Sequence, residues 1–316
     1  MQCSLPVNKR PTHVSVSFQG NKTATNRLQI IYPGTLIRNF TVCYSVLHSG
    51  YKSTSQLIQS LEMNQILGAE HFVVYNYSIS PAVDQILQRY QQDGLVTVLP
   101  WPLPTKQSWY YGQMSALNDC VYRNRNISRF VVVVDTDEFV MPKNHSNWME
   151  MIAATSPQEY DVSTFVHSPN PPKKASAKTG CFIVRSSFFS TSSETNWTSF
   201  PPEFPFSKEE KNNTIKYNIL VLHQLLRSSE IYRAKVKSKY IARPELTHTC
   251  GIHFVHTFTY FMRCSVVSHS IALVHHYRKP TMKGGIMDTT MLRFKSQLYP
   301  RVLKKYKLFP KIFSSG

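Results

Sequence analysis

The sequence is short of acidic residues, of long hydrophobic runs and of closely spaced cysteines. It has 36 lysines and arginines against 18 aspartates and glutamates, which gives a formal net charge of +18 at pH 7. No stretch approaches the roughly 20 apolar residues that a helix needs to cross a bilayer, and residues 1–20 lack the apolar core of a signal peptide. We therefore expect either a cytosolic protein or a chain without its N-terminal targeting segment.

The cysteines exclude one class of site and leave two alternatives open. None of the six belongs to a Cys-x-x-Cys pair, which argues against a structural zinc site. Their even number permits disulfides, whereas buried free thiols are also common in folded proteins. Seven Asn-x-Ser/Thr sites favour a secretory lumen, where such sites accept glycans. These sites begin at Asn21, Asn39, Asn76, Asn126, Asn144, Asn196 and Asn212.

The composition is typical of a folded protein that meets anions. Hydrophobic residues make up 42% of the chain and charged residues 17%, a balance that argues against disorder. The positive charge would attract nucleotides, acidic glycans, nucleic acid or an acidic membrane surface. A solvated basic face is the plainer interpretation. A polyanion-binding module without catalysis is therefore one possible function.

Strand and helix patterns alternate between residues 40 and 134. Ser80 and Pro81 form a good helix start, and a glycine follows where that helix would end. The expected strands are 40–47, 71–75, 95–99 and 130–134, and the expected helices are 55–67, 81–93 and 113–122. This order predicts an α/β fold of Rossmann type, a mostly parallel sheet with helices on both faces.

The rest of the chain has weaker patterns. Residues 167–214 are rich in serine, threonine, proline, asparagine and lysine, and we expect them to be mostly loop. Residues 216–227 look helical, and residues 291–307 could form a basic amphipathic helix. Short strands are expected at 237–241 and 268–274.

The most informative segment is RFVVVVDTDEFVMP, residues 129–142. Its five consecutive apolar residues predict a strand buried on both faces, which runs directly into Asp135, Asp137 and Glu138. Unpaired charge is costly to bury, so a positive group must compensate. At the carboxyl end of a parallel strand, a divalent cation bridging to a pyrophosphate would do so. Carboxylates suit Mn²⁺ or Mg²⁺. The alternative is a solvated turn whose carboxylates cap a helix.

Several blocks of the sequence resemble glycosyltransferase family 92. They are residues 42–80, 113–120, 135–142, 237–258 and 275–280, so that the resemblance covers residues 40–280. It implies a GT-A-like glycosyltransferase domain over those residues, preceded by an N-terminal extension at 1–39 and followed by a basic C-terminal tail at 281–316.

The resemblance also implies a function. Family members transfer galactose from UDP-galactose, with inversion, to glycan acceptors that include fucose and galactose. They are type II membrane proteins of the Golgi lumen, and the family's anchor is absent from this sequence. The expected partners are a nucleotide sugar, a glycan acceptor and a membrane, and no nucleic acid is expected.

Candidate site residues follow from the matching blocks. Asp135 and Asp137 match the motif that binds the metal ion and the UDP-sugar, and His253 and His276 are candidates to complete the metal site. The candidates for donor contacts are Gln113, Asp119 and Arg278, the last through a phosphate. An inverting enzyme needs a base near the acceptor hydroxyl. The candidates for that base are Glu194, Glu203 and Glu245, and the sequence does not choose among them.

Overall fold

The structure is a computed structural model. It describes residues 8–17, 26–32, 35–103, 108–160, 179–192, 195–279 and 284–313. Residues 1–35 form one compact unit and residues 36–316 a second. In the first unit, β1 (His13–Val14) pairs antiparallel with β2 (Leu28–Gln29). All further elements belong to the second unit, which contains the acidic motif.

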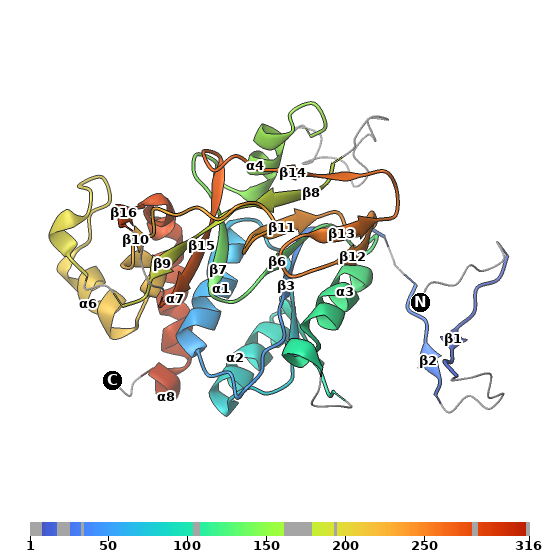
Figure 1. The fold of residues 1–316 in the computed structure, drawn as a ribbon. Helices are drawn as coiled ribbons and strands as arrows, with labels where there is room; N and C mark the ends of the chain where they lie inside the picture. Colours follow the sequence, from blue (N-terminus) through green and yellow to red (C-terminus); the bar gives the residue numbers. More distant parts are fainter. Residues whose placement is uncertain are drawn as a thin grey trace. The chain divides into compact units, whose positions relative to one another are not determined.

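A seven-stranded sheet forms the centre of the second unit (Figure 1). Its strand order is β14-β8-β11-β6-β3-β4-β5. Four neighbouring pairs are parallel, whereas β11 runs antiparallel between β6 and β8. The expectation of a mostly parallel sheet is confirmed. The strands are β3 (Arg38–Tyr44), β4 (His71–Asn76), β5 (Val96–Pro100), β6 (Ser128–Val134), β8 (Thr179–Val184), β11 (Lys239–Ala242) and β14 (Arg263–Val266).

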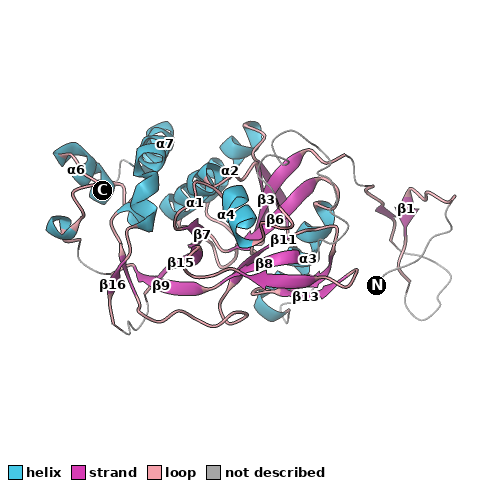
Figure 2. Ribbon diagram, turned by 90° about the horizontal axis from the view of Figure 1, so that it is seen from above, coloured by secondary structure: helices cyan, strands magenta, loops and turns pink. Residues whose placement is uncertain are grey.

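Helices cover both faces of this sheet, as the sequence predicts. Alternate residues of β6 point to opposite sides, so that Val132 and Val134 join one hydrophobic cluster and Val131 and Val133 another. The first cluster includes α1 (Thr54–Ile66), α2 (Pro81–Gln92), α4 (Trp148–Thr155) and α7 (Lys295–Leu308), and the second includes α3 (Gln113–Arg123). In Figure 2, α1, α2 and α7 lie on one side of the strands and α3 on the other. Burial on both faces explains the unbroken apolar run of β6.

A second sheet starts directly after the acidic motif. Its strand order is β16-β10-β9-β15-β7, and β7 pairs antiparallel with β15. The strands are β7 (Glu138–Pro142), β9 (Ser186–Ser190), β10 (Leu226–Arg227), β15 (Ala272–Arg278) and β16 (Ile286–Met287). Because β6 belongs to one sheet and β7 to the other, Asp135 and Asp137 lie in the short turn that joins the two sheets, and Glu138 is the first residue of β7.

Two expectations for the middle of the chain are wrong. Residues 179–192 and 195–214 are not mostly loop, because they contain β8, β9 and most of α6 (Lys208–Lys216); residues 161–178 lie outside the described residues. Residues 216–227 are not a helix. They form η3 (Leu220–Leu222) and β10 after Asn218, whose φ of 48° breaks the helical path. Every residue of β8 and β9 is buried, but short strands that mix serine with apolar residues show no clear period.

Two disulfides cross-link the second unit. Cys43 on β3 is bonded to Cys120 on α3, and Cys181 on β8 is bonded to Cys264 on the neighbouring strand β14. Cys250 is a buried free thiol, and the sixth cysteine lies outside the described residues. Both alternatives that the sequence left open therefore occur. Among the described residues, no helix has the length and apolar character that a membrane crossing requires.

Candidate functional site

The acidic motif lines a cavity of about 570 Å³. The cavity opens where β3 and β6 end, at the edge of the central sheet where ligands of α/β proteins bind. The side chains of Asp135 and Asp137 are 33% and 28% exposed, whereas that of Glu138 is 2% exposed. The lining residues are Ser45, Val46, Leu47, His48, Tyr51, Tyr110, Gln113, Asp135, Thr136, Asp137, His276, Arg278 and Lys279.

A buried lysine supplies the positive charge that the motif requires. Strand β11 runs antiparallel to β6 with Tyr240 opposite Val133, so that Lys239 lies beside the end of β6. Its ammonium donates to Asp135 Oδ2 and lies 2.8 Å from Glu138 Oε2, and its side chain is 0% exposed. A buried charge pair of this kind requires close geometry to offset its desolvation. The sequence alone predicted a divalent cation in this role, whereas Lys239 supplies positive charge from the protein itself.

Lys239 affects the pKa values of Asp135 and Glu138 unequally. Burial alone would raise the pKa of Asp135, but the Lys239 ammonium and a hydrogen bond from Ser45 lower it well below its ordinary value. Burial raises the pKa of Glu138 to about 7, against the attraction of Lys239. Glu138 also accepts a hydrogen bond of 2.8 Å from the backbone N–H of Asp135. Asp135 is thus held by Lys239 and Ser45 at its carboxylate and by Glu138 at its backbone N–H.

Asp137 has a different partner. The pairing of β15 with β7 places His276 opposite Glu138. The Nε2 atom of His276 lies 3.4 Å from Asp137 Oδ2, and its Nδ1 atom lies 3.2 Å from Glu138 Oε1. Burial alone would lower the pKa of His276, but its hydrogen bond with Asp137 and the charge of Glu138 raise it. Among the residues that the structure describes, His276 is the one ion-pair partner of the Asp137 carboxylate.

The three carboxylates fit a hard divalent cation. Asp135, Asp137 and Glu138 each offer one oxygen, and these oxygens lie within 4.8 Å of one another. Oxygen donors are the ligands that Mn²⁺ and Mg²⁺ prefer. Because Lys239 already contacts the carboxylates of Asp135 and Glu138, the carboxylate best placed to bind a cation directly is that of Asp137. His276, already in contact with Asp137, can then ligate or steady it.

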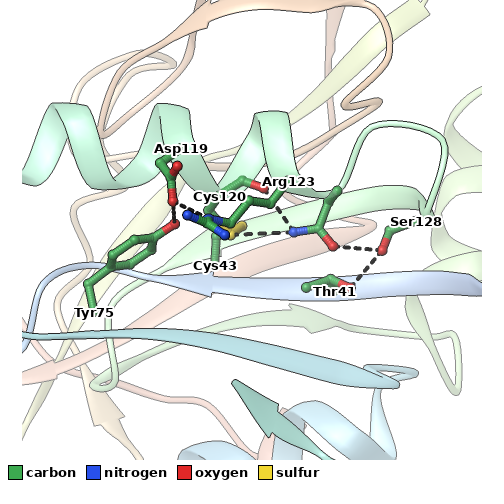
Figure 3. The surroundings of a disulfide bond; sticks show 8 residues. Thr41, Cys43, Tyr75, Asp119, Cys120, Arg123 and Ser128 are labelled. Atoms are coloured by element: carbon green, nitrogen blue, oxygen red, sulfur yellow. Dashed lines mark hydrogen bonds and ion pairs between the residues drawn. A yellow bond between two sulfur atoms is a disulfide. The ribbon is translucent and has the colours of Figure 1, made fainter. Parts of the chain in front are cut away.

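Gln113 connects the motif to α3. Its side-chain amide donates to Ser45 Oγ at 2.7 Å, and Ser45 in turn is hydrogen-bonded to Asp135. Ser45 follows β3 and Gln113 begins α3, the two elements that the Cys43–Cys120 disulfide joins. Figure 3 shows this disulfide between the strand and the helix. The cross-link therefore fixes the distance between two walls of the cavity.

An aromatic turn forms the rim of the cavity. Tyr110, Tyr111 and Gly112 have successive φ values of 46°, 56° and 69°, a conformation that is unusual for tyrosine and is concentrated at functional sites. The ring of His48 stacks on Tyr111 with centroids 4.1 Å apart, and Tyr111 is also hydrogen-bonded to Ser49. The turn holds Tyr110 at the cavity, where a flat base could stack on it.

The structure brings together some of the site residues predicted from the sequence. Asp135, Asp137, His276, Gln113 and Arg278 all line the cavity. Each of them lies at the end of a strand or just after it, except Gln113, which is the first residue of a helix. Lys239, Ser45, Tyr110 and Lys279 were not identified. The sequence does contain a signal for Lys239. It is the first residue of an otherwise apolar strand, and a lysine at such a position is buried.

The remaining donor and metal candidates lie elsewhere. Asp119 accepts a hydrogen bond of 2.7 Å from Tyr75 and pairs with Arg123 (Figure 3), away from the cavity lining. His253 is hydrogen-bonded to the backbone of Ser238 behind Lys239 and does not line the cavity.

Of the three candidates for the base, the two that the structure describes do not line the cavity. Glu245 pairs with Arg243 beyond the end of β11. Because β11 is antiparallel to β6, Glu245 lies at the opposite edge of the sheet from Asp135. Glu203 is exposed and does not line the cavity. Glu194 lies outside the described residues.

Comparisons with known proteins agree on one family. The sequence model of glycosyltransferase family 92 matches residues 38–309. The chain is similar to the beta-1,4-galactosyltransferase galt-1 of Caenorhabditis elegans, with 25% identity over 118 residues, 36% of this chain and 28% of that protein. It is also 27% identical over 139 residues to the glycosyltransferase family 92 protein F13G3.3 of that organism, covering 40% of this chain and 27% of that protein. The matched segments thus span little more than a quarter of each relative.

Solved structures show a more distant likeness. TarS of S. aureus covers 76% of this chain, with 60% of its own chain matched, 14% identity and a TM-score of 0.39. The mannosyltransferase PcManGT of Pyrobaculum calidifontis, in complex with GDP-Man and Mn²⁺, covers 90% of this chain. In that case 78% of its own chain is matched, at 12% identity and a TM-score of 0.39.

Proposed function

The chain belongs to glycosyltransferase family 92, and we propose that it transfers galactose from UDP-galactose to a glycan acceptor in a metal-dependent, inverting reaction. The observation that carries this proposal is the Asp135–Asp137–Glu138 cluster, which lines a cavity at the end of a buried strand. The printed name of the galactosyltransferase relative supports the choice of galactose. The oxygen-rich cluster supports the dependence on Mn²⁺ or Mg²⁺.

The chain's own residues divide the work of binding the donor. Asp137 would hold the cation, with Asp135 and Glu138 held in place by Lys239. Arg278 and Lys279 line the same cavity and place positive charge where the diphosphate would lie. Ser45, Gln113 and Tyr110 line the part nearest β3 and α3, which suits the nucleoside. When bound, the cation supplies Lewis-acid stabilisation of the departing diphosphate.

The proposed reaction exchanges one carbon–oxygen bond for another. The oxygen of an acceptor hydroxyl forms a bond with the anomeric carbon of galactose from the face opposite the leaving group. The bond from that carbon to the diphosphate oxygen breaks, and its electron pair stays on the diphosphate. The hydroxyl proton passes to a base beside the acceptor and from there to solvent. Arg278 is positioned to stabilise the charge that develops on the diphosphate.

We also propose that the protein works in the Golgi lumen as a type II membrane protein. The disulfides Cys43–Cys120 and Cys181–Cys264 support an oxidising compartment, because disulfides rarely persist in the cytosol. The asparagines of four glycosylation motifs, Asn126, Asn144, Asn196 and Asn212, are exposed. Treatment of the cell-expressed protein with a glycan-removing amidase should therefore increase its electrophoretic mobility. An unchanged mobility would contradict the luminal assignment.

Calorimetry with UDP tests the catalytic proposal. The wild-type protein should bind UDP in the presence of Mn²⁺ and lose most of this affinity when the metal is chelated. Asp137→Asn should weaken Mn²⁺-dependent UDP binding by at least about 100-fold and abolish slow UDP-galactose hydrolysis. Asp84→Asn is a matched control, because Asp84 is a partly buried aspartate on α2 outside the cavity.

One outcome would favour a polyanion-binding module instead. UDP affinity that is equal in Asp137→Asn and the wild type, with and without metal, would remove the basis for catalysis. Heparin binding that weakens steeply with salt would then be the expected property of a chain with a net charge of +18.

A further inference from the structure

A second cavity lies on the other side of Asp137. Its volume is about 460 Å³, and it shares Asp137 and Arg278 with the first cavity. Its lining comes from the start of α1, from β7, from the residue that follows β9, from the loop that leads into η3 and from the end of β15. The lining residues are Lys52, Ser53, Thr54, Ser55, Gln56, Gln59, Asp137, Phe139, Thr191, Asn218, Leu220, Val221, Tyr277 and Arg278.

The two cavities differ in chemistry. The first is lined by charged and titratable groups, which include both aspartates, His276, Arg278 and Lys279. The second is lined mainly by hydroxyl and amide side chains, with an apolar patch that contains Phe139. Hydroxyl and amide groups both donate and accept hydrogen bonds, and an apolar patch accommodates the C–H face of a sugar ring. This lining suits a neutral, hydroxyl-rich ligand better than a diphosphate.

The floor of the second cavity is rigid. Ser55 Oγ donates to the backbone oxygen of Asn218 at 2.9 Å and also contacts Tyr306. Gln59 donates to the same backbone oxygen and accepts from the N–H of Val221. The network ties α1 to the loop that precedes η3, so that the cavity is a fixed feature of the fold.

The boundary between the cavities is where the two substrates of a transfer reaction must meet. Thr191 N–H donates to the backbone oxygen of Arg278, which extends the β9–β15 pairing along this boundary. A sugar whose diphosphate is held at Asp137 and Arg278 would face the second cavity from the first. Catalysis needs the reacting atoms about 3 Å apart, a distance that only an acceptor in an adjoining cavity can reach.

We propose that the second cavity is the acceptor site and that it binds a neutral sugar residue. This inference rests on the proposed function, because it assigns the second substrate of the same reaction. The acceptor hydroxyl would lie beside Asp137, and the hydroxyls of Ser53 and Thr54, at the start of α1, would bind the other hydroxyls of the ring. Arg278 would contact both substrates and so couple their binding.

Filling the second cavity from its outer wall tests this proposal. Thr191→Trp should lower kcat/KM for acceptors, measured with methyl β-galactoside and methyl α-fucoside, by at least about 10-fold. Its Mn²⁺-dependent UDP affinity and its acceptor-free hydrolysis of UDP-galactose should stay within about two-fold of the wild type. The matched control is Ser192→Trp, one residue further along, exposed and outside the cavity lining. Ser53→Trp blocks the opposite wall at an exposed residue, and it replaces Thr191→Trp if that variant misfolds.

The outcomes separate this inference from the proposed function. If the wild type neither binds UDP with Mn²⁺ nor hydrolyses UDP-galactose, the proposed function fails first. If the wild type does both, and the folded variant keeps its acceptor kcat/KM within about two-fold, the acceptor assignment is overturned. A variant that loses UDP affinity as well would overturn it too, because the second cavity would then belong to the donor.

Discussion

Asp135 and Asp137 lie two residues apart in the same turn, yet their carboxylates have different surroundings. Asp135 contacts the buried ammonium of Lys239 and the hydroxyl of Ser45, whereas Asp137 contacts His276 and lines both cavities. Their exposed fractions are similar, so exposure alone does not distinguish them. The difference teaches that partner residues decide the role of each carboxylate: Asp135 fixes the shape of the site, and Asp137 is left to bind a ligand.

The largest expected effect is the loss of stability around Asp135 when the charge of Lys239 is removed. Lys239→Met leaves Asp135 and Glu138 next to each other without a cation, and we expect the free energy of unfolding to fall by roughly 3–5 kcal/mol. Urea denaturation measures this. The double variant Lys239→Met/Glu138→Gln should recover part of the loss, because it also removes one buried negative charge. Equal stability of Lys239→Met and the wild type would mean that Asp135 is not held as described.

The Cys43–Cys120 disulfide tests whether the frame around Asp135 is rigid. Replacing both cysteines with serine releases a cross-link that spans 77 residues, and chain entropy alone predicts a loss of up to about 4 kcal/mol. The UDP affinity should fall as well, because Ser45 and Gln113 lie on the two elements that the bond joins. The matched control is the Cys181→Ser/Cys264→Ser variant, whose bond links β8 to β14. A loss of UDP affinity in the control alone would contradict this argument.

The two aspartates should separate stability from metal binding. Asp135→Asn removes one of the two anions that contact Lys239, and a lost buried charge-assisted bond costs about 1–3 kcal/mol of unfolding free energy. Asp137→Asn should change stability less and weaken Mn²⁺ binding more, as measured by the Mn²⁺ electron paramagnetic resonance signal without UDP. If Asp135→Asn lowers Mn²⁺ affinity as much as Asp137→Asn does, the two carboxylates share the cation equally.

The sequence predicts the strand that carries Asp135 better than it predicts the contact of Asp135 with Lys239, because the first depends on neighbouring residues and the second on distant ones. The strand that ends at Asp135 follows from a local run of apolar residues, and the Ser80 cap with Pro81 marks α2. These signals lie within a few residues of one another. The contact of Lys239 with Asp135 joins residues 104 positions apart and depends on the antiparallel register of β11, which no local pattern encodes.

Strand length explains the errors in the remaining fold. Strands β8 and β9 have six and five residues, and Arg185 separates them as the chain passes from one sheet to the other. The buried hydroxyl of Ser187 on β9 donates to the distant backbone oxygen of Ser228. Polar residues inside such short strands make the composition of the strands resemble that of a loop. The second cavity could not be predicted for a similar reason, since its lining comes from five separated segments.

The smallest expected effect is a pH dependence of the stability that the contact between His276 and Asp137 contributes. Contacts with Asp137 and Glu138 raise the pKa of His276 in the folded state. A raised pKa contributes stability that is fully present below the unfolded pKa of about 6.5 and is lost as pH rises through the folded value. His276→Gln should therefore lower the free energy of unfolding by roughly 1 kcal/mol at pH 6 and by less at pH 8.5. His248→Gln, at a partly buried histidine outside both cavities, is the control. A deficit that grows with pH would show that His276 is neutral beside Asp137, and the two aspartates would then differ only through Lys239.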